Sequence, residues 1–373
     1  MTIRLRQAAG TCLLGLMGLA GACAPASAEV TLTLGSALPV KHVVVADGLM
    51  PFVEAVKQSS HGDVVWNLVP GGAMGNWVES FEALRNGGLD GASVVDINVA
   101  SDLPLANVVS NLAMVGEDPR VMAAAVNELT LVKSPALLQD WLEEGVRPLS
   151  ALSLAPFYLM CTSEVTSLDQ VKGKRIRADG AYGLWVTAMG ATPVNIQSVE
   201  LFEAMQRGQV DCAIAAGAWL RSFSLFDVVK SMVNLRLGLF FGAWALAMNE
   251  DRWESLTPEQ REANRSNLAG ITRRCVEAYI KEDAAVMAEA TGKGVAVTKP
   301  SQDMLDLLAA HRKKEVERVL AQASERGVPG AEPLVNDFLA LVEKWKKIVA
   351  ETGDDYDAYQ TALEREIFSK VGA

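Results

Sequence analysis

Short apolar runs alternate with amphipathic helical patterns along most of the chain. Residues 30–34 and 64–68 predict strands, and residues 48–58 between them predict a helix. No low-complexity linker interrupts this alternation. The pattern is typical of an α/β fold, in which helices cover the faces of a sheet.

One pattern of helix, stop and strand occurs twice. Residues 79–92 align without gaps to residues 200–213, and seven of the fourteen positions are identical. Each copy predicts a short helix with acidic residues in its first turn, ended by a glycine and followed directly by a strand. Such a unit can recur by chance in an α/β protein. We favour two related lobes that each carry one copy, because 373 residues are enough for more than one domain.

Helical patterns dominate the last third of the chain. Thr257, Pro258 and Gln260 form a capping sequence that predicts a helix start. The next stop signal is at residues 291–292, since Gly270 alone is tolerated inside a helix. We therefore expect one helix of more than thirty residues, roughly 50 Å long at 1.5 Å per residue, that braces both lobes. The tail, residues 301–325 and 334–351, is predicted to be helical and amphipathic.

The first 28 residues predict an export signal. Arg4 and Arg6 precede the apolar run 13–20, and the Ala-Ser-Ala sequence at 26–28 is a small-residue cleavage site. The apolar run is shorter than the ~20 residues that a membrane-spanning helix needs, so cleavage is favoured over anchoring. The protein is therefore expected in the periplasm, with a mature chain that begins near Glu29.

Export changes the cysteine count. It removes Cys12 and Cys23 and leaves Cys161, Cys212 and Cys275. Lipidation of Cys23 is the less favoured alternative to cleavage. Because an odd number cannot all pair within one chain, we favour small buried apolar residues over a Cys161–Cys212 disulfide, which an oxidising compartment would allow.

The net charge excludes two classes of partner. The chain has 34 Lys and Arg against 45 Asp and Glu, and loss of Arg4 and Arg6 leaves 32 against 45, a net charge of −13. Nucleic acids and anionic membrane surfaces bind to basic faces. We expect neither as a partner.

Catalytic motifs are missing from the sequence. His42, His61 and His311 are the three histidines, and none has a metal-binding spacing. There is no Gly-x-Ser-x-Gly elbow, phosphate loop or dinucleotide fingerprint. The glycine-rich residues 71–76 are compatible with an anion-binding turn and equally with an ordinary tight turn. We expect no enzyme activity, no cofactor and no metal site.

A basic run is the remaining candidate. Residues 172–177 read Lys-Gly-Lys-Arg-Ile-Arg, four cations in an acidic chain, before a turn at 178–180. Arg177 comes last, at the carboxyl end of the predicted strand, which is where open α/β sheets bind ligands. An arginine there can hold a carboxylate with two parallel hydrogen bonds. Taken alone, however, such a run is more often solvent-facing charge at a strand edge.

Residues 171–211 resemble the extracytoplasmic solute-binding proteins of TRAP transporters, the DctP-like family. The matching positions are Gly173, Arg175 to Arg177, Met189 to Val194 and Glu200 to Asp211, with further likeness at 35–37, His42, 81–90 and 249–259. The resemblance covers most of the mature chain.

The resemblance implies a two-lobed α/β periplasmic binding protein with hinge strands, a long brace helix and a helical C-terminal tail. We expect lobe I to comprise residues 29–153 plus 240–290, and lobe II residues 154–239 plus 291–373. The family closes over a small organic acid, whose carboxylate the matched Arg177 would hold. Small and large membrane subunits of a TRAP permease would then accept the ligand for ion-driven uptake. A homodimer formed through the tail is left open. The alternative is a ligand-sensing protein that presents its closed form to a membrane receptor.

Three positions depart from the sialic-acid-binding branch of that family. Tyr158, Ala215 and Val95 stand where that branch carries Arg, Asn and Glu. A hydroxyl-rich ligand would lose hydrogen-bond partners there, so we expect one carboxylate on a less polar body. The remaining candidates are Tyr158 and Asn76 as hydrogen-bond partners, and Trp77, Phe157, Tyr158 and Trp219 as walls, although large aromatic residues more often belong to the core.

Overall fold

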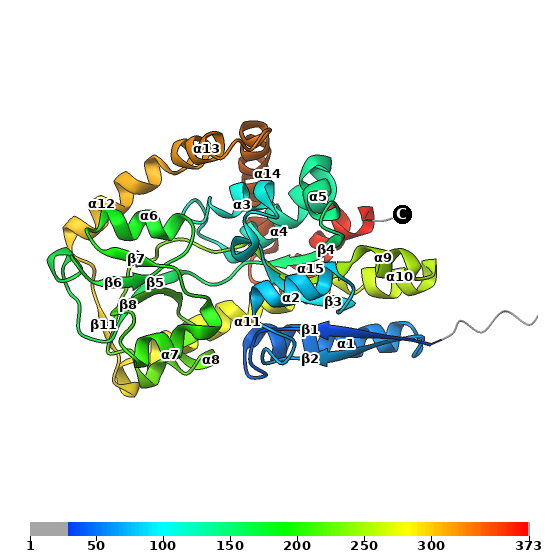
Figure 1. The fold of residues 1–373 in the computed structure, drawn as a ribbon, viewed down its shortest axis with the longest axis horizontal. Helices are drawn as coiled ribbons and strands as arrows, with labels where there is room; N and C mark the ends of the chain where they lie inside the picture. The colour runs from blue at the N-terminus through cyan, green and yellow to red at the C-terminus, as the bar shows by residue number, and fades with distance from the viewer. Residues whose placement is uncertain (1–28, 372–373) are drawn as a thin grey trace, which may run out of the picture.

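The computed structural model describes residues 29–371, which form two β-sheets surrounded by helices (Figure 1). Sheet A has the strand order β2-β1-β3-β10-β4, and sheet B the order β11-β9-β5-β8-β6-β7. The strands of sheet A are β1 (Val30–Gly35), β2 (Val64–Val69), β3 (Gly91–Val95), β4 (Val146–Leu152) and β10 (Ala243–Asn249). The strands of sheet B are β5 (Phe157–Cys161), β6 (Arg175–Arg177), β7 (Thr192–Val194), β8 (Cys212–Ala216), β9 (Ser231–Val233) and β11 (Ala296–Thr298). The predicted export signal and Cys23 lie outside the described residues.

Helices occupy most of the remaining chain. In the first half they are α1 (Met50–Ser59), α2 (Trp77–Arg85), α3 (Pro104–Ser110), α4 (Pro119–Glu128), α5 (Pro135–Leu142) and α6 (Ala181–Ala188). In the second half they are α7 (Leu201–Gln206), α8 (Trp219–Ser222), α9 (Glu250–Ser255), α10 (Pro258–Arg265), α11 (Leu268–Glu289), α12 (Gln302–Lys313), α13 (Glu315–Glu325), α14 (Ala331–Thr352) and α15 (Tyr356–Glu366). The predicted strands at 30–34 and 64–68 are confirmed. The helix predicted at 48–58 is α1, preceded by a π-helical turn, Val44–Leu49.

The repeated sequence pattern corresponds to one unit in each lobe. Its first copy forms α2 and β3 of sheet A, and its second copy forms α7 and β8 of sheet B. The glycine after each helix adopts a left-handed conformation, with φ of 73° at Gly87 and 64° at Gly208. This conformation ends the helix without a steric penalty. The predicted two-lobed α/β architecture is therefore confirmed.

Two extended segments cross between the sheets. Residues 153–156 lead from β4 to β5, and residues 234–242 lead from β9 to β10. The segments pair with each other, because the Leu154 N–H donates to the Phe240 carbonyl (2.9 Å) and the Phe157 N–H to the Gly238 carbonyl (3.0 Å). These paired segments are the predicted hinge strands.

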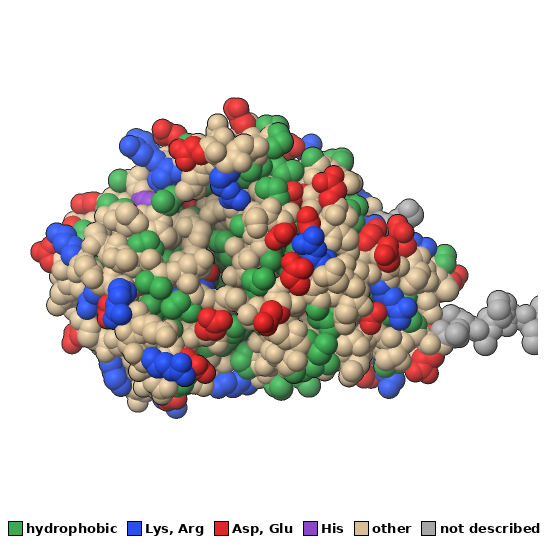
Figure 2. Space-filling view, in the orientation of Figure 1, with side chains coloured by type: hydrophobic (Ala, Val, Ile, Leu, Met, Phe, Trp, Pro, Cys, Tyr) green, Lys and Arg blue, Asp and Glu red, His purple; other side chains and the backbone are tan. Residues whose placement is uncertain are grey.

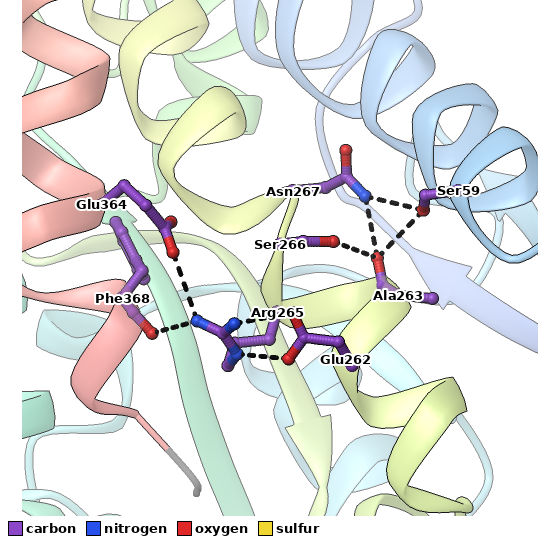
Figure 3. A network of polar contacts seen from close by, with 8 residues as sticks. All are labelled: Ser59, Glu262, Ala263, Arg265, Ser266, Asn267, Glu364 and Phe368. Carbon is purple, nitrogen blue, oxygen red and sulfur yellow. Dashed lines mark hydrogen bonds and ion pairs between the residues drawn. The ribbon is translucent and has the colours of Figure 1, made fainter.

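The predicted long helix is interrupted, and the expectation of one continuous helix is wrong. Helix α10 ends at Arg265 and α11 begins at Leu268 (Figure 3). At the break, the Asn267 side chain donates to the Ala263 carbonyl (2.8 Å), while its backbone N–H donates to Asn264 instead (3.1 Å). Asparagine competes in this way for the hydrogen bond that would continue a helix, and the sequence pattern does not show which residue will do so. The brace is therefore α11, whose 22 residues span about 33 Å.

The tail is helical as predicted and extends over both sheets (Figure 1). Helix α12 contacts α6 beside sheet B, whereas α14 packs along α4 and α15 along α11. The division of the chain into lobe I and lobe II at the predicted boundaries stays a prediction. Among residues 29–371, no single helix is both long and apolar enough to span a membrane, and one pair, Pro119–Lys133 and Pro135–Leu142, passes that test only jointly with a bend of 86°.

The surface carries charges of both signs. On the face shown in Figure 2, acidic and basic side chains are interspersed, without a continuous basic patch.

A disulfide joins two strands of sheet B. Cys161 in β5 lies directly opposite Cys212 in β8, and their sulfur atoms are bonded. The preference for unpaired thiols was wrong for this pair, because the antiparallel register that brings them together across 51 residues is a tertiary feature. Cys275, in α11, is a buried free thiol, as expected for a small apolar residue.

Candidate ligand-binding site

A cavity lies between the two sheets, where residues from both lobes meet. It contains about 580 Å³ of space, counting the part that opens to solvent. Its aromatic walls are Trp77, Phe157, Trp219, Phe223, Phe240 and Trp244. The polar side chains that line it are His42, Ser93, Asn98, Arg177, Asp179, Ser198 and Tyr279. A mostly apolar enclosure with a few polar groups is typical of a small-molecule site.

Arg177 is the one cationic side chain among the residues that line this cavity. It ends β6 and is only 2% exposed. Its Nε donates to the Ile196 carbonyl (2.8 Å), its Nη1 to the Ile214 carbonyl (3.2 Å) and its Nη2 to Asp179 Oδ2 (2.5 Å). These bonds fix the orientation of the guanidinium group. The guanidinium group has five N–H donors, and these three bonds occupy three of them. Among residues 29–371, the other two donors, one on Nη1 and one on Nη2, have no recorded partner.

The turn after Arg177 packs against the other lobe. Gly180 has a φ of +51°, and a Cβ atom there would lie 2.3 Å from the Cδ1 atom of Ile97. The positive φ would strain any other residue here, and a side chain would also force Ile97 to shift, so glycine suits this close approach to lobe I. The predicted position of Arg177, at a strand end before a tight turn, agrees with the structure.

Aromatic rings from β5, α6 and α8 pack against one another beside the cavity. Phe157 stacks on Tyr182 with 5.0 Å between ring centroids, and Trp219 meets Phe157 edge to face at 5.3 Å. The Cζ atom of Arg177 lies 5.6 Å from the Trp219 ring centroid. Both predicted walls, Phe157 and Trp219, therefore line the cavity, and cation–π attraction to Trp219 supports the position of the arginine.

Trp77 belongs to the cavity and also joins the two lobes. Its backbone N–H donates to Gln197 Oε1 and its indole Nε1 to Ser198 Oγ, both at 3.2 Å. Nearby, Lys41 Nζ donates to Ser224 Oγ (2.7 Å) across the same gap. The lobes are thus in direct contact around the cavity, which limits the access of water to its polar groups.

His42 and Tyr279 are cavity residues that the sequence did not identify as such. His42 is buried, and desolvation lowers its pKa to about 3, so its ring is neutral at physiological pH. Its Nδ1 accepts from the Val44 N–H (3.2 Å), which places the proton on Nε2, 3.4 Å from the Tyr279 hydroxyl. Burial raises the pKa of Tyr279. The pair offers neutral hydrogen-bonding groups, and the only available signal was the resemblance at His42.

Tyr158 and Ala215 lie on the opposite face of sheet B, away from the cavity. They are paired with each other in the register of β5 and β8. The Tyr158 hydroxyl donates to Asp283 Oδ2 of α11 (3.1 Å). Neighbouring residues of a strand point to opposite faces, so Tyr158 cannot share the face of Phe157. The structure does not bring these two predicted residues to the site.

Asn76 is also outside the residues that line the cavity. Its side chain accepts hydrogen bonds from the backbone N–H groups of Val78 (3.0 Å) and Glu79 (3.1 Å), and the Glu79 carboxylate accepts from the Asn76 N–H (2.9 Å). This is a capping box that begins α2. It accounts for Asn76 as a helix cap.

Of the three positions that differ from the sialic-acid-binding branch, only Val95 lines the cavity. Tyr158 and Ala215 therefore give no direct support to a less polar ligand, because they lie away from the cavity. The aromatic and aliphatic walls now support it instead. Among residues 29–371, no group of three or more His, Cys, Asp or Glu side chains is arranged to hold a metal ion.

The chain matches a known protein family over most of its length. Residues 35–322 match the family described as bacterial extracellular solute-binding protein, family 7. A solute-binding protein of Albidiferax ferrireducens is 24% identical over 242 residues, which are 64% of this chain and 70% of that protein.

Solved structures show the same fold. A TRAP periplasmic solute-binding protein of Bordetella bronchiseptica, with bound (R)- and (S)-mandelate, is 24% identical with a TM-score of 0.73, covering 85% of this chain and 99% of the other. A TRAP solute-binding protein of Rhodoferax ferrireducens, in complex with copurified benzoate, is 17% identical with a TM-score of 0.76, covering 86% and 100%. From the match over most of its length, this chain belongs to bacterial extracellular solute-binding protein family 7, the DctP family of TRAP solute-binding proteins.

Proposed function

We propose that this protein is the periplasmic solute-binding subunit of a TRAP transporter and that it captures a small organic acid with one carboxylate and a largely apolar body. The observation that carries the proposal is Arg177. It is buried at an aromatic cavity between two lobes and retains N–H donors on both Nη1 and Nη2.

The free donors suit one carboxylate. Two N–H groups on different Nη atoms can bind the two oxygens of a carboxylate in parallel. The guanidinium is already held by the Ile196 and Ile214 carbonyls, so little ordering is needed when the ligand binds. Exclusion of water by the contacting lobes strengthens the ion pair.

The apolar lining of the cavity supports a ligand with an apolar body. Six tryptophan and phenylalanine side chains line the cavity together with aliphatic residues, whereas five lining side chains are neutral and polar. A ligand with many hydroxyl groups would leave several of them without partners, at a cost of about 1–3 kcal/mol each. Mandelate and benzoate, bound by the two structural relatives, each combine one carboxylate with an aromatic body.

Delivery to a permease distinguishes transport from sensing. The chain would leave the cytoplasm by its predicted export signal, bind its acid and pass it to the membrane subunits. Deletion of the gene is expected to abolish uptake of the bound acid by intact cells. A sensing protein would bind the same acid but leave uptake unchanged.

The ligand class can be tested by the unfolding temperature of the purified protein in a panel of acids. Benzoate, mandelate and pyroglutamate are compared with D-glucuronate and sialic acid at equal concentration. We expect at least one acid with an apolar body to raise the unfolding temperature more than either sugar acid, because bound ligand stabilises the native state. The proposal fails if a sugar acid stabilises the protein most.

A further inference from the structure

The carboxylate of Asp179 occupies one side of the arginine that is proposed to bind the ligand. Its Oδ2 accepts from Arg177 Nη2 at 2.5 Å, and its side chain is 17% exposed. Asp179 itself lines the cavity. Because it stands two residues after Arg177, at the turn into α6, the chain holds both charges at one end of the cavity.

The cavity is therefore neutral before any ligand binds. Among the described residues that line it, Arg177 contributes one positive charge and Asp179 one negative charge. His42 adds none, since its buried ring has a pKa of about 3. A simple carboxylate that binds to Arg177 would leave a net charge of −1 in a cavity enclosed by aromatic rings. Burial of such an uncompensated charge is costly.

The hydrogen bonds of the arginine make displacement of Asp179 unnecessary. Nη1 donates one hydrogen to the Ile214 carbonyl, and Nη2 donates one to Asp179. Among residues 29–371, each of these two nitrogens therefore has one N–H group without a recorded partner. A ligand carboxylate can use these two donors while Asp179 keeps its own. The ligand carboxylate would then lie close to the carboxylate of Asp179, and the two negative charges would repel each other.

We propose that the ligand is a zwitterion, a small amino acid with an apolar or aromatic side chain, whose carboxylate binds Arg177 and whose ammonium group binds Asp179. This inference rests on the proposed function and specifies its ligand class. The ammonium restores neutrality and separates the two carboxylates. Phe157 and Trp219, which pack edge to face at the cavity, provide a wall for the side chain. Asp179 is then the residue that selects amino acids over the corresponding deaminated acids.

The test uses two pairs of probes that differ only in the ammonium group. L-Phenylalanine is compared with 3-phenylpropanoate, and L-leucine with 4-methylpentanoate, by titration calorimetry on the full mature chain. We expect the amino acid of at least one pair to bind about a hundredfold more tightly than its deaminated partner, because a site built around a polar group rejects the analogue that lacks it.

Asp179→Asn should remove this preference while it retains the shape of the side chain. Loss of the carboxylate weakens binding of the amino acid and strengthens binding of the deaminated acid. Asp169→Asn is the matched control, since Asp169 is a solvent-exposed partner of Lys172 and its substitution changes the net charge equally. The control is expected to preserve the preference of the wild type, and the unfolding temperatures of both variants show whether they are folded.

The outcomes separate this inference from the proposed function. If the wild type binds the deaminated acids at least as tightly as the amino acids, and does so through Arg177, the zwitterion is overturned while the proposed function stands. A preference for amino acids that survives in Asp179→Asn also overturns the role of Asp179. If neither pair binds and none of the acids in the unfolding panel does, the proposed function fails together with the inference.

Discussion

The two faces of β5 in sheet B have different tasks, although their residues are neighbours in the sequence. Phe157 lies on the cavity face in edge-to-face contact with Trp219, and Trp219 in turn lies beside the buried guanidinium of Arg177. Tyr158, the next residue, lies on the opposite face and donates its hydroxyl hydrogen to Asp283 of the brace helix α11. One face can recognise an acid, and the other attaches the sheet to the helix that joins the lobes.

The two faces also differ in the partner that each gives to a carboxylate. On the cavity face, the carboxylate of Asp179 is paired with a guanidinium. On the brace face, the carboxylate of Asp283 has a tyrosine hydroxyl as its partner, and desolvation raises the pKa of Asp283 to about 6. The cavity face thus pairs a carboxylate with a cation, whereas burial on the brace face shifts the Asp283 carboxyl group towards its neutral form.

The largest effect is expected from Arg177→Ala. Its affinity for the most stabilising acid of the panel should fall at least about a hundredfold, because loss of one partner of a buried ion pair costs several kcal/mol. Arg175→Ala is the matched control, since Arg175 is an exposed arginine on the same strand, paired with Asp211. Calorimetry on both variants tests this prediction, and an unchanged affinity in Arg177→Ala would contradict the assignment.

A smaller effect should separate the two neighbours on β5. Phe157→Ala is expected to weaken binding about tenfold, because the ligand loses an aromatic contact. Tyr158→Phe should leave the affinity unchanged within about twofold and lower the free energy of unfolding by about 1 kcal/mol, because it removes only the buried hydrogen bond to Asp283. Equal losses of affinity in the two variants would refute the distinction between the faces.

The last expected effect concerns the pH dependence of stability on the brace face and does not involve ligand binding. Burial raises the pKa of Asp283 from 3.8 to about 6, so the folded protein binds more protons than the unfolded chain between these values. Its contribution to stability is therefore complete below pH 3.8 and is lost as the pH rises through 6. Asp283→Asn, which cannot ionise, should be more stable than the wild type by about 1–2 kcal/mol at pH 8 and equal to it near pH 3.5.

Chemical denaturation at both pH values measures this difference. If the advantage of Asp283→Asn were as large at pH 3.5 as at pH 8, ionisation of Asp283 would not be its cause.

Local sequence signals account for most of the fold. The apolar runs located β1 and β2, and the repeated unit located α2 with β3 and α7 with β8. The break between α10 and α11 was not predictable in this way, because it depends on the Asn267 side chain competing for the Ala263 carbonyl. The disulfide was missed since register is set by sheet pairing.

The structure places some of the predicted site residues at the cavity and others away from it. Arg177 at the end of β6 and the walls Trp77, Phe157 and Trp219 lie at the cavity. Tyr158 was expected there together with its neighbour, which strand alternation does not allow. His42 and Tyr279 come from distant parts of the chain, and only tertiary packing brings them together.

A crystal structure with the most stabilising acid of the panel tests the central claim most directly. We expect the carboxylate of that acid within about 3 Å of Nη1 and Nη2 of Arg177, with its body against Phe157. A ligand bound elsewhere, or one held on the Tyr158 face of sheet B, would contradict the account.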